Sequence, residues 1–153
     1  MINQDVGFIL LKLDNSPAYN VVLDTIYKFI EDRPFNQFVI FNSQCDKTDT
    51  RNIPILHVSH AQFFTGNLVL FDIASAIMSK AFTNVKNRFL YATDTPWTVS
   101  SKNRYSDWLE IYGNKNLEII VANNSLYDIY NIVWKQPTGI SENFNYEQIK
   151  NIL

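Results

Sequence analysis

The chain has 153 residues, of which 46% are hydrophobic and 18% are charged, and this length and composition are typical of one globular domain with a single core. A formal net charge of −2 excludes a strong electrostatic footprint for nucleic-acid binding. The single cysteine excludes an internal disulfide. The amino terminus does not have the basic segment and following apolar stretch that would indicate secretion. No apolar run approaches the ~20 residues of a membrane helix. We therefore expect a cytoplasmic protein without a membrane span.

The first third of the chain predicts a strand, a helix and a second strand. Residues 6–13 form an apolar run, interrupted by Lys12, that stops at a turn beginning with Asp14. Pro17 suits the first position of a helix, Ser16 suits its N-cap, and apolar residues recur at helical spacing up to about residue 31. Residues 38–41 form a second short apolar run, which a polar surface loop follows.

The middle of the chain predicts three more strands and a helix. Residues 53–58 form a strand that begins near Pro54, and proline is tolerated at the first residue or edge of a strand. Residues 68–71 form the fourth strand, which ends at Asp72. Helical spacing of apolar residues predicts a helix over 73–82, and residues 89–92 form the fifth strand.

The last third predicts three helices and a sixth strand. An aromatic-rich helix over 105–112 ends at Gly113, a residue suited to a left-handed C-terminal cap. The sixth strand covers 117–122, and a helix covers 125–134. Asn145 followed by Gln148 fits an Asn-capped variant of the capping box and opens a last helix through Ile152.

Alternation of strands and helices over the whole length predicts the architecture. We expect a single α/β domain over residues 1–153, a three-layer Rossmann-like sandwich with a parallel sheet of about six strands and helices on both faces.

Polar side chains follow the predicted strands, and in open parallel sheets ligands bind outside the carboxyl ends of the strands. The candidate substrate-binding residues at this edge are Asn15, Ser16, His57, His60, Thr93, Asn123 and Ser125. The same residue types are favoured as helix N-caps and turn formers, so a capping role is the alternative at each position.

Asp94 is the candidate catalytic residue. In Thr93-Asp-Thr-Pro-Trp97 its carboxylate lies beside an aromatic ring and a rigid proline, where it can act as a general base or bind a sugar hydroxyl. The alternative is an Asx-turn before Pro96, with Trp97 packing at the edge of the sheet.

His57 and His60 are the only histidines, and they converge only if the chain turns after Val58. A metal site needs further ligands and the only cysteine is remote, so we expect no metal site. The sequence has no Gly-x-Gly-x-x-Gly motif, Walker loop, Gly-x-Ser-x-Gly elbow or Cys-x-x-Cys motif, which removes the usual support for nucleotide hydrolysis and dehydrogenase chemistry.

Four segments from residue 68 onward each include all or part of a predicted strand or helix. In chain order they are Leu68-Val-Leu-Phe-Asp72, Arg88-Phe-Leu-Tyr-Ala-Thr-Asp94, Glu118-Ile-Ile-Val-Ala-Asn-Asn-Ser125 and Ser141-Glu-Asn-Phe-Asn-Tyr-Glu147. This order resembles the amino-terminal domain of GT-B fold glycosyltransferases over roughly residues 53–147. The Ile53-Pro-Ile-Leu56 segment and the Asn143-Phe144 pair are similar to segments of the bacteriophage DNA glucosyltransferases within that family.

The resemblance implies a glycosyltransferase-like lobe that recognises an acceptor, either a glycan or modified DNA, with a sugar nucleotide as the donor and no tightly bound cofactor. For a phage protein it implies the host cytoplasm. The resemblance gives Asp94 the catalytic role and gives binding roles to Thr93, Asn123, Ser125 and Asn143.

The chain departs from the family pattern in three ways. Asp14-Asn-Ser-Pro17 stands where a glycine-rich loop is common, and Thr93 stands where a histidine often precedes the aspartate. The sequence also lacks the C-terminal lobe that holds most of the donor site, so we expect function to depend on a second lobe or partner protein. Two alternatives stay open: a non-enzymatic interaction module that retained the fold, and a small α/β enzyme using His57 or His60 with Asp72 or Asp94.

Overall fold

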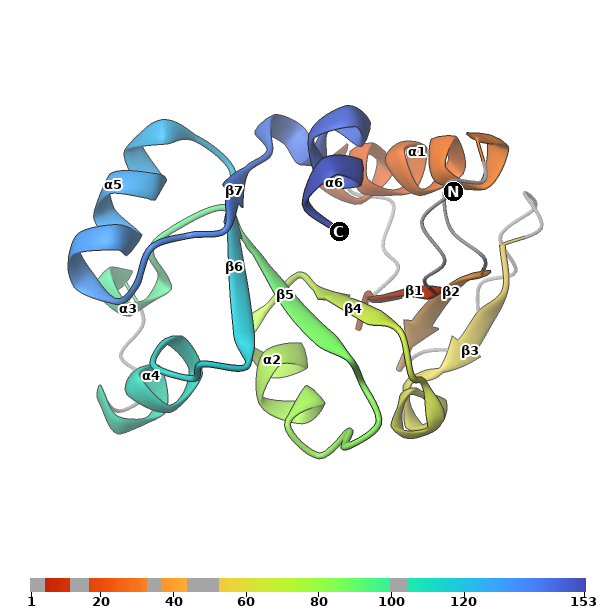
Figure 1. Cartoon of the computed structure of the whole chain (residues 1–153), viewed down its shortest axis with the longest axis horizontal. Helices are drawn as coiled ribbons and strands as arrows, with labels where there is room; N and C mark the ends of the chain where they lie inside the picture. The colour runs from red at the N-terminus through yellow and green to blue at the C-terminus, as the bar shows by residue number, and fades with distance from the viewer. Residues whose placement is uncertain (1–4, 12–16, 33–36, 44–52, 100–104) are drawn as a thin grey trace.

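The protein is a seven-stranded, all-parallel sheet flanked by helices (Figure 1). The computed structural model describes residues 5–11, 17–32, 37–43, 53–99 and 105–153. The strand order is β3-β2-β1-β4-β5-β6-β7. The strands are β1 (Asp5–Ile9), β2 (Gln37–Asn42), β3 (Ile55–His57), β4 (Asn67–Leu70), β5 (Asn87–Ala92), β6 (Leu117–Val121) and β7 (Gly139–Ile140).

The central strands are apolar along their length because both faces of the sheet are covered. In the register, Phe8 of β1 lies between Ile40 of β2 and Val69 of β4, and all three side chains are fully buried. A parallel strand buried on both faces requires such a continuous apolar run, which is why the short runs in the sequence predict strands.

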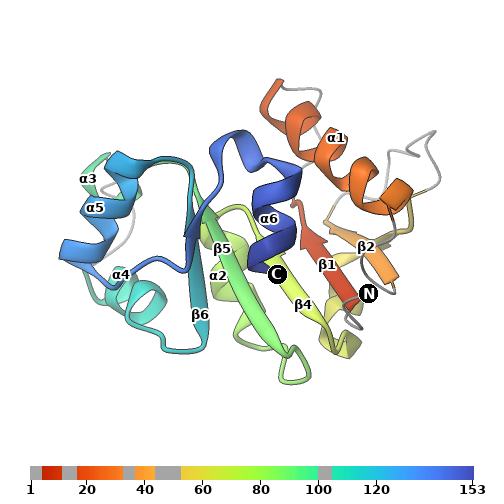
Figure 2. The ribbon, with the colours of Figure 1, turned by 45° about the horizontal axis from the view of Figure 1, so that its top comes forward.

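The helical segments form the two outer layers. They are α1 (Pro17–Asp32), η1 (Val58–Phe63), α2 (Ile73–Ser79), α3 (Pro96–Val99), α4 (Tyr105–Tyr112), α5 (Asn124–Val133), η2 (Glu142–Phe144) and α6 (Tyr146–Ile152). Helices α1 and α6 lie together on one side of the sheet, with α2 and α4 on the other (Figures 1 and 2).

Each outer layer buries its own apolar cluster. Ile26 and Phe29 of α1 and Ile149 of α6 pack on Phe8 and Val69 of the sheet. The opposite face carries a second cluster in which buried residues of η1, α2, α4 and α5 pack against the other side of the strands. The result confirms the predicted three-layer α/β sandwich.

Short polar side chains cap three of the helices, and for Asn145 the spacing in the sequence predicts this role. Asp72 caps α2 and forms a reciprocal capping box with Ser75. Asn123 Oδ1 accepts the Leu126 N–H at 2.9 Å at the start of α5. Asn145 Oδ1 accepts the amides of Glu147 and Gln148 at the start of α6.

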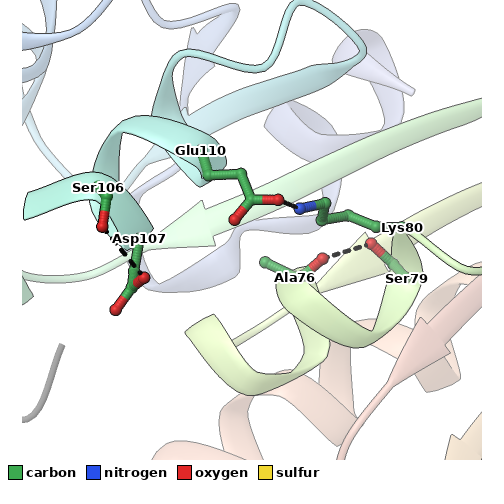
Figure 3. A network of polar contacts seen from close by, with 6 residues as sticks. All are labelled: Ala76, Ser79, Lys80, Ser106, Asp107 and Glu110. Carbon is green, nitrogen blue, oxygen red and sulfur yellow. Dashed lines mark hydrogen bonds and ion pairs between the residues drawn. The ribbon is translucent and has the colours of Figure 1, made fainter. Parts of the chain in front are cut away.

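Helices α2 and α4 are joined at their exposed surface by an ion pair (Figure 3). Lys80 Nζ donates to Glu110 Oε1, while Ser79 Oγ donates to the Ala76 carbonyl at 2.8 Å. Ser106 and Asp107 lie on the same surface of α4, with their side-chain oxygens 3.5 Å apart. Such exposed pairs contribute about 0–1 kcal/mol, so the apolar contacts beneath hold the two helices together.

Several predicted boundaries differ from those observed. The first strand ends at Ile9 rather than reaching residue 13, and the helix after Asp72 ends at Ser79. Gln148 does not complete a capping box, because its side chain accepts the Glu142 N–H at 2.9 Å. The predicted N-cap Ser16 lies outside the described residues.

The prediction of a left-handed cap at Gly113 is wrong. No glycine of the described residues has a positive φ. Gly113 is favoured instead by space, because a Cβ there would lie 2.5 Å from the Leu109 carbonyl oxygen. No sequence pattern marks β7, because its two residues, Gly139 and Ile140, are too few to form an apolar run.

Candidate functional site

A cavity of about 480 Å³ opens at the carboxyl edge of the sheet. Residues that follow β1, β4, β5 and β6 meet there, and α1 and η2 cover them. The lining residues are Leu10, Val21, Val22, Phe71, Asp72, Tyr91, Thr93, Ala122, Asn143 and Phe144.

The strand order explains why a cavity forms at this place. β1 pairs with β2 on one side and with β4 on the other, and the chain passes from β1 to β2 on one face but from β4 to β5 on the opposite face. The connections therefore diverge beyond β1 and β4, and such a switch point is where open α/β sheets bind ligands.

Three aromatic rings form an apolar part of the cavity wall. The Phe144 ring centroid lies 5.0 Å from that of Phe71 and 5.0 Å from that of Tyr91, in edge-to-face contacts. Edge-to-face pairs are favourable, and the cluster presents ring edges and faces to an occupant. A flat apolar group therefore suits this wall.

The cover of the cavity is a turn with unusual backbone geometry. Asn143 and Phe144 have φ values of 51° and 52°, a left-handed conformation that costs a non-glycine residue roughly 1–2 kcal/mol. Two hydroxyls hold the turn in place. Tyr91 Oη accepts the Phe144 N–H at 2.9 Å and donates to the Ser141 carbonyl at 2.8 Å, and Thr25 Oγ1 donates to the Phe144 carbonyl at 2.8 Å.

Burial raises the pKa of the Tyr91 hydroxyl above its ordinary value of 10.0. The hydroxyl therefore stays protonated at neutral pH, as its donation to Ser141 requires. Tyr91 is a structural support of the cavity rather than a group available for proton transfer.

The polar groups of the cavity come from three separate elements. Asp72 is half-buried, and its Oδ1 is used to cap α2 through the Ser75 N–H at 2.6 Å. Thr93 and Asn143 are exposed at the rim. Together they offer a carboxylate, a hydroxyl and an amide, groups that bind the hydroxyls of a neutral ligand.

The structure brings two of the predicted site residues, Thr93 and Asn143, to this cavity. Asp94 is exposed and follows Thr93 at the rim, but its side chain does not line the cavity. Its carbonyl accepts the Tyr130 hydroxyl at 3.0 Å, which ties the end of β5 to α5. Asn123 caps α5, and Ser125 is exposed in the first turn of that helix.

The Tyr130 hydroxyl that contacts the Asp94 carbonyl also lies 3.4 Å from the hydroxyl of Tyr112. Burial raises the pKa of Tyr112 to about 12 and also raises the pKa of Tyr130. Both groups are protonated at neutral pH, so this pair acts as a buried hydrogen-bonded support beneath the rim.

The histidines lie away from the cavity, at β3, on the edge of the sheet beyond β2. The chain does turn after His57, since η1 begins at Val58. His57 Nδ1 lies 2.8 Å from Ser59 Oγ, and within the described segments no hydrogen bond joins either histidine to a carboxylate. The described residues contain no group of three or more metal-ligating side chains.

Asn15 and Ser16, the remaining predicted binding residues, lie outside the described residues. Sequence reasoning missed the aromatic wall formed by Phe71, Tyr91 and Phe144. The sequence does contain a signal for Tyr91. Side chains two residues apart on a strand share a face, so Tyr91 is expected on the same face as the rim residue Thr93. No comparable signal places Phe144 against them, since the contact depends on the turn after β7.

No helix in the described part of the chain combines the length and apolar character needed to cross a membrane. Scans against family models, curated proteins and solved structures find no match to this chain.

Proposed function

We propose that the chain is a glycosyltransferase-like lobe that binds an acceptor in the cavity at the carboxyl edge of its sheet. The observation that carries the proposal is the cavity itself, at the switch point between β1 and β4. The glycosyltransferase part of the proposal is supported by the GT-B resemblance of the sequence and by the Rossmann-like sheet.

The lining of the cavity indicates the kind of acceptor. An apolar or aromatic group fits against Phe71, Tyr91 and Phe144, while Thr93 and Asn143 at the rim offer hydrogen bonds to hydroxyls. Among the residues that the structure describes, the lining contains one carboxylate and no cationic side chain, which disfavours a phosphate group. A neutral alcohol or glycoside that carries an apolar ring is the acceptor class that fits best.

Asp94 is the proposed general base for the acceptor hydroxyl. It is exposed next to Thr93, outside the cavity, where a donor held by a second lobe can approach. In a transfer assay reconstituted with a donor-binding lobe, Asp94→Ala should abolish sugar transfer. Unchanged transfer by this variant would refute the catalytic role.

Acceptor binding is testable on the isolated chain with phenyl β-D-glucopyranoside as the probe. We expect calorimetry to detect its binding, and Thr93→Trp to weaken it about tenfold or more, since the new ring fills the mouth of the cavity. The matched control is Thr83→Trp, an exposed position in the turn before β5 at the opposite edge of the sheet. Equal affinity of the Thr93 and Thr83 variants would refute the assignment of the cavity.

An interaction module is the second candidate function, and the surface of α4 and α5 favours it. Leu109, Ile129, Ile132 and Val133 are exposed there, with Ile132 at 83%. Tyr105 stacks on Trp134 at a centroid distance of 6.0 Å and joins the two helices. Exposed apolar patches mark interaction sites. A module that lost its chemistry should bind no probe in the cavity, so the same calorimetry separates the two functions.

A further inference from the structure

A second cavity, of about 350 Å³, lies beside the first between α1 and the segment that leads into α6. Val21 and Asn143 line both cavities. Figure 2 shows α1 and α6 on the same side of the sheet, with the chain between β7 and α6 passing toward α1. The two cavities therefore share a wall at the left-handed turn.

The two cavities differ in chemistry. The first is lined mainly by apolar side chains. The second is lined by charged and amide side chains, among them Asp24, Lys28, Glu142 and Gln148. This lining offers the carboxylate acceptors of Asp24 and Glu142, the ammonium donors of Lys28 and the amide N–H groups of Gln148. A polyhydroxyl group can satisfy such a mixture of donors and acceptors from several sides.

We infer that the two cavities are subsites of one groove that takes a two-part ligand, with an apolar ring in the first and a neutral polyhydroxyl group in the second. The inference rests on the proposed function and adds the second subsite to it. Asn143 lies at the junction, and the Tyr91 and Thr25 hydroxyls hold the turn through the N–H and the carbonyl of the next residue, Phe144. The turn thus fixes the angle between the two halves of the groove.

The charges of the second subsite set its preference. Asp24 and Glu142 carry negative charge and Lys28 carries positive charge, so the mixed lining suits an uncharged group better than a phosphate or a sulfate. Lys28 is the side chain best suited to a test, because it is exposed on α1 and lines the second cavity but not the first.

The test compares three probes by calorimetry: phenol, methyl β-D-glucopyranoside and phenyl β-D-glucopyranoside. A two-part groove predicts that phenyl glucoside binds about tenfold or more tightly than phenol, since each tenfold corresponds to about 1.4 kcal/mol of added contact. Lys28→Ala should remove about fivefold or more of this advantage and leave phenol binding unchanged. The matched control Lys86→Ala, an exposed lysine before β5, should change neither affinity.

Equal affinities of phenol and phenyl glucoside would overturn the second subsite while leaving the first cavity as a binding site. An advantage of the glucoside that Lys28→Ala fails to reduce would also overturn it. Failure of all three probes to bind would overturn the proposed function together with this inference. The unfolding midpoint of each variant, measured in urea, shows whether a lost affinity comes from lost folding.

Discussion

Removal of one hydroxyl, by Tyr91→Phe, tests whether the left-handed turn is held in place by the sheet. Tyr91 is 5% exposed, and its hydroxyl accepts the Phe144 N–H at 2.9 Å and donates to the Ser141 carbonyl at 2.8 Å. The substitution keeps the ring and its packing against Phe144. It leaves a buried N–H without an acceptor, which costs about 1–3 kcal/mol.

The left-handed backbone of the turn limits how much stability the Tyr91→Phe substitution can remove. Relaxation of Phe144 to an ordinary backbone recovers roughly 1–2 kcal/mol, whereas asparagine tolerates the left-handed region, so the turn can release part of the cost by leaving its position. We therefore expect Tyr91→Phe to lower the free energy of unfolding by about 1–2 kcal/mol, the lower part of that range, and to weaken phenyl glucoside binding.

Urea unfolding followed by tryptophan fluorescence measures the loss of stability. The matched control is Tyr127→Phe, which removes a hydroxyl that accepts from the Gln136 side chain at an exposed site, at 3.0 Å. It should change stability by less than about 0.5 kcal/mol. A Tyr91→Phe variant as stable as this control would refute the reasoning that the tyrosine holds the turn.

Three further predictions concern stability. Asn123→Ala should cost about 1 kcal/mol through loss of the α5 N-cap, whereas Ser125→Ala should cost less than half of that; equal costs in urea unfolding would contradict a capping role. Gly66→Ala should destabilise the protein more than Gly139→Ala. A Cβ at position 66 would lie 2.1 Å from the Asp5 carbonyl oxygen, which is backbone, whereas a Cβ at position 139 would lie 2.6 Å from Cδ1 of the Ile152 side chain, which can move. The thermal unfolding midpoints of the two variants test this order. Burial raises the pKa of Tyr112 from 10.0 to about 12, so as the pH rises the unfolded chain releases this proton before the folded chain does. The free energy of unfolding should therefore be unaffected by this group below pH 10 and should fall by up to about 2–3 kcal/mol as the pH rises toward 12. Urea unfolding across this range should show a smaller fall for the Tyr112→Phe variant.

The sequence predicted the layers of the fold well because local patterns report burial. The apolar runs of the central strands arise from burial on both faces, and Asn123 and Asn145 mark helix starts through hydrogen bonds made within one turn. Gly113 shows the limit of such rules, because the residue type fits two causes, a left-handed backbone and a close approach of the Leu109 carbonyl.

The candidate site was predictable only at its edge. Thr93 follows directly from the end of β5, and Asn143 came from the family resemblance rather than from spacing. The contact between Tyr91 and Phe144 joins residues 53 positions apart, and it depends on the strand order and on two left-handed residues that no local pattern marks. The separation of the histidines from the cavity follows from the position of β3 at the edge of the sheet.

The central claim is that the cavity between β1 and β4 binds a ligand, and backbone amide NMR during a titration with phenyl β-D-glucopyranoside tests it most directly. We expect saturable shifts at Thr93, Asn143 and Phe144, which belong to two distant parts of the chain, the end of β5 and the η2 turn, and meet at this cavity. The absence of saturable shifts, or shifts confined to α4 and α5, would contradict the claim.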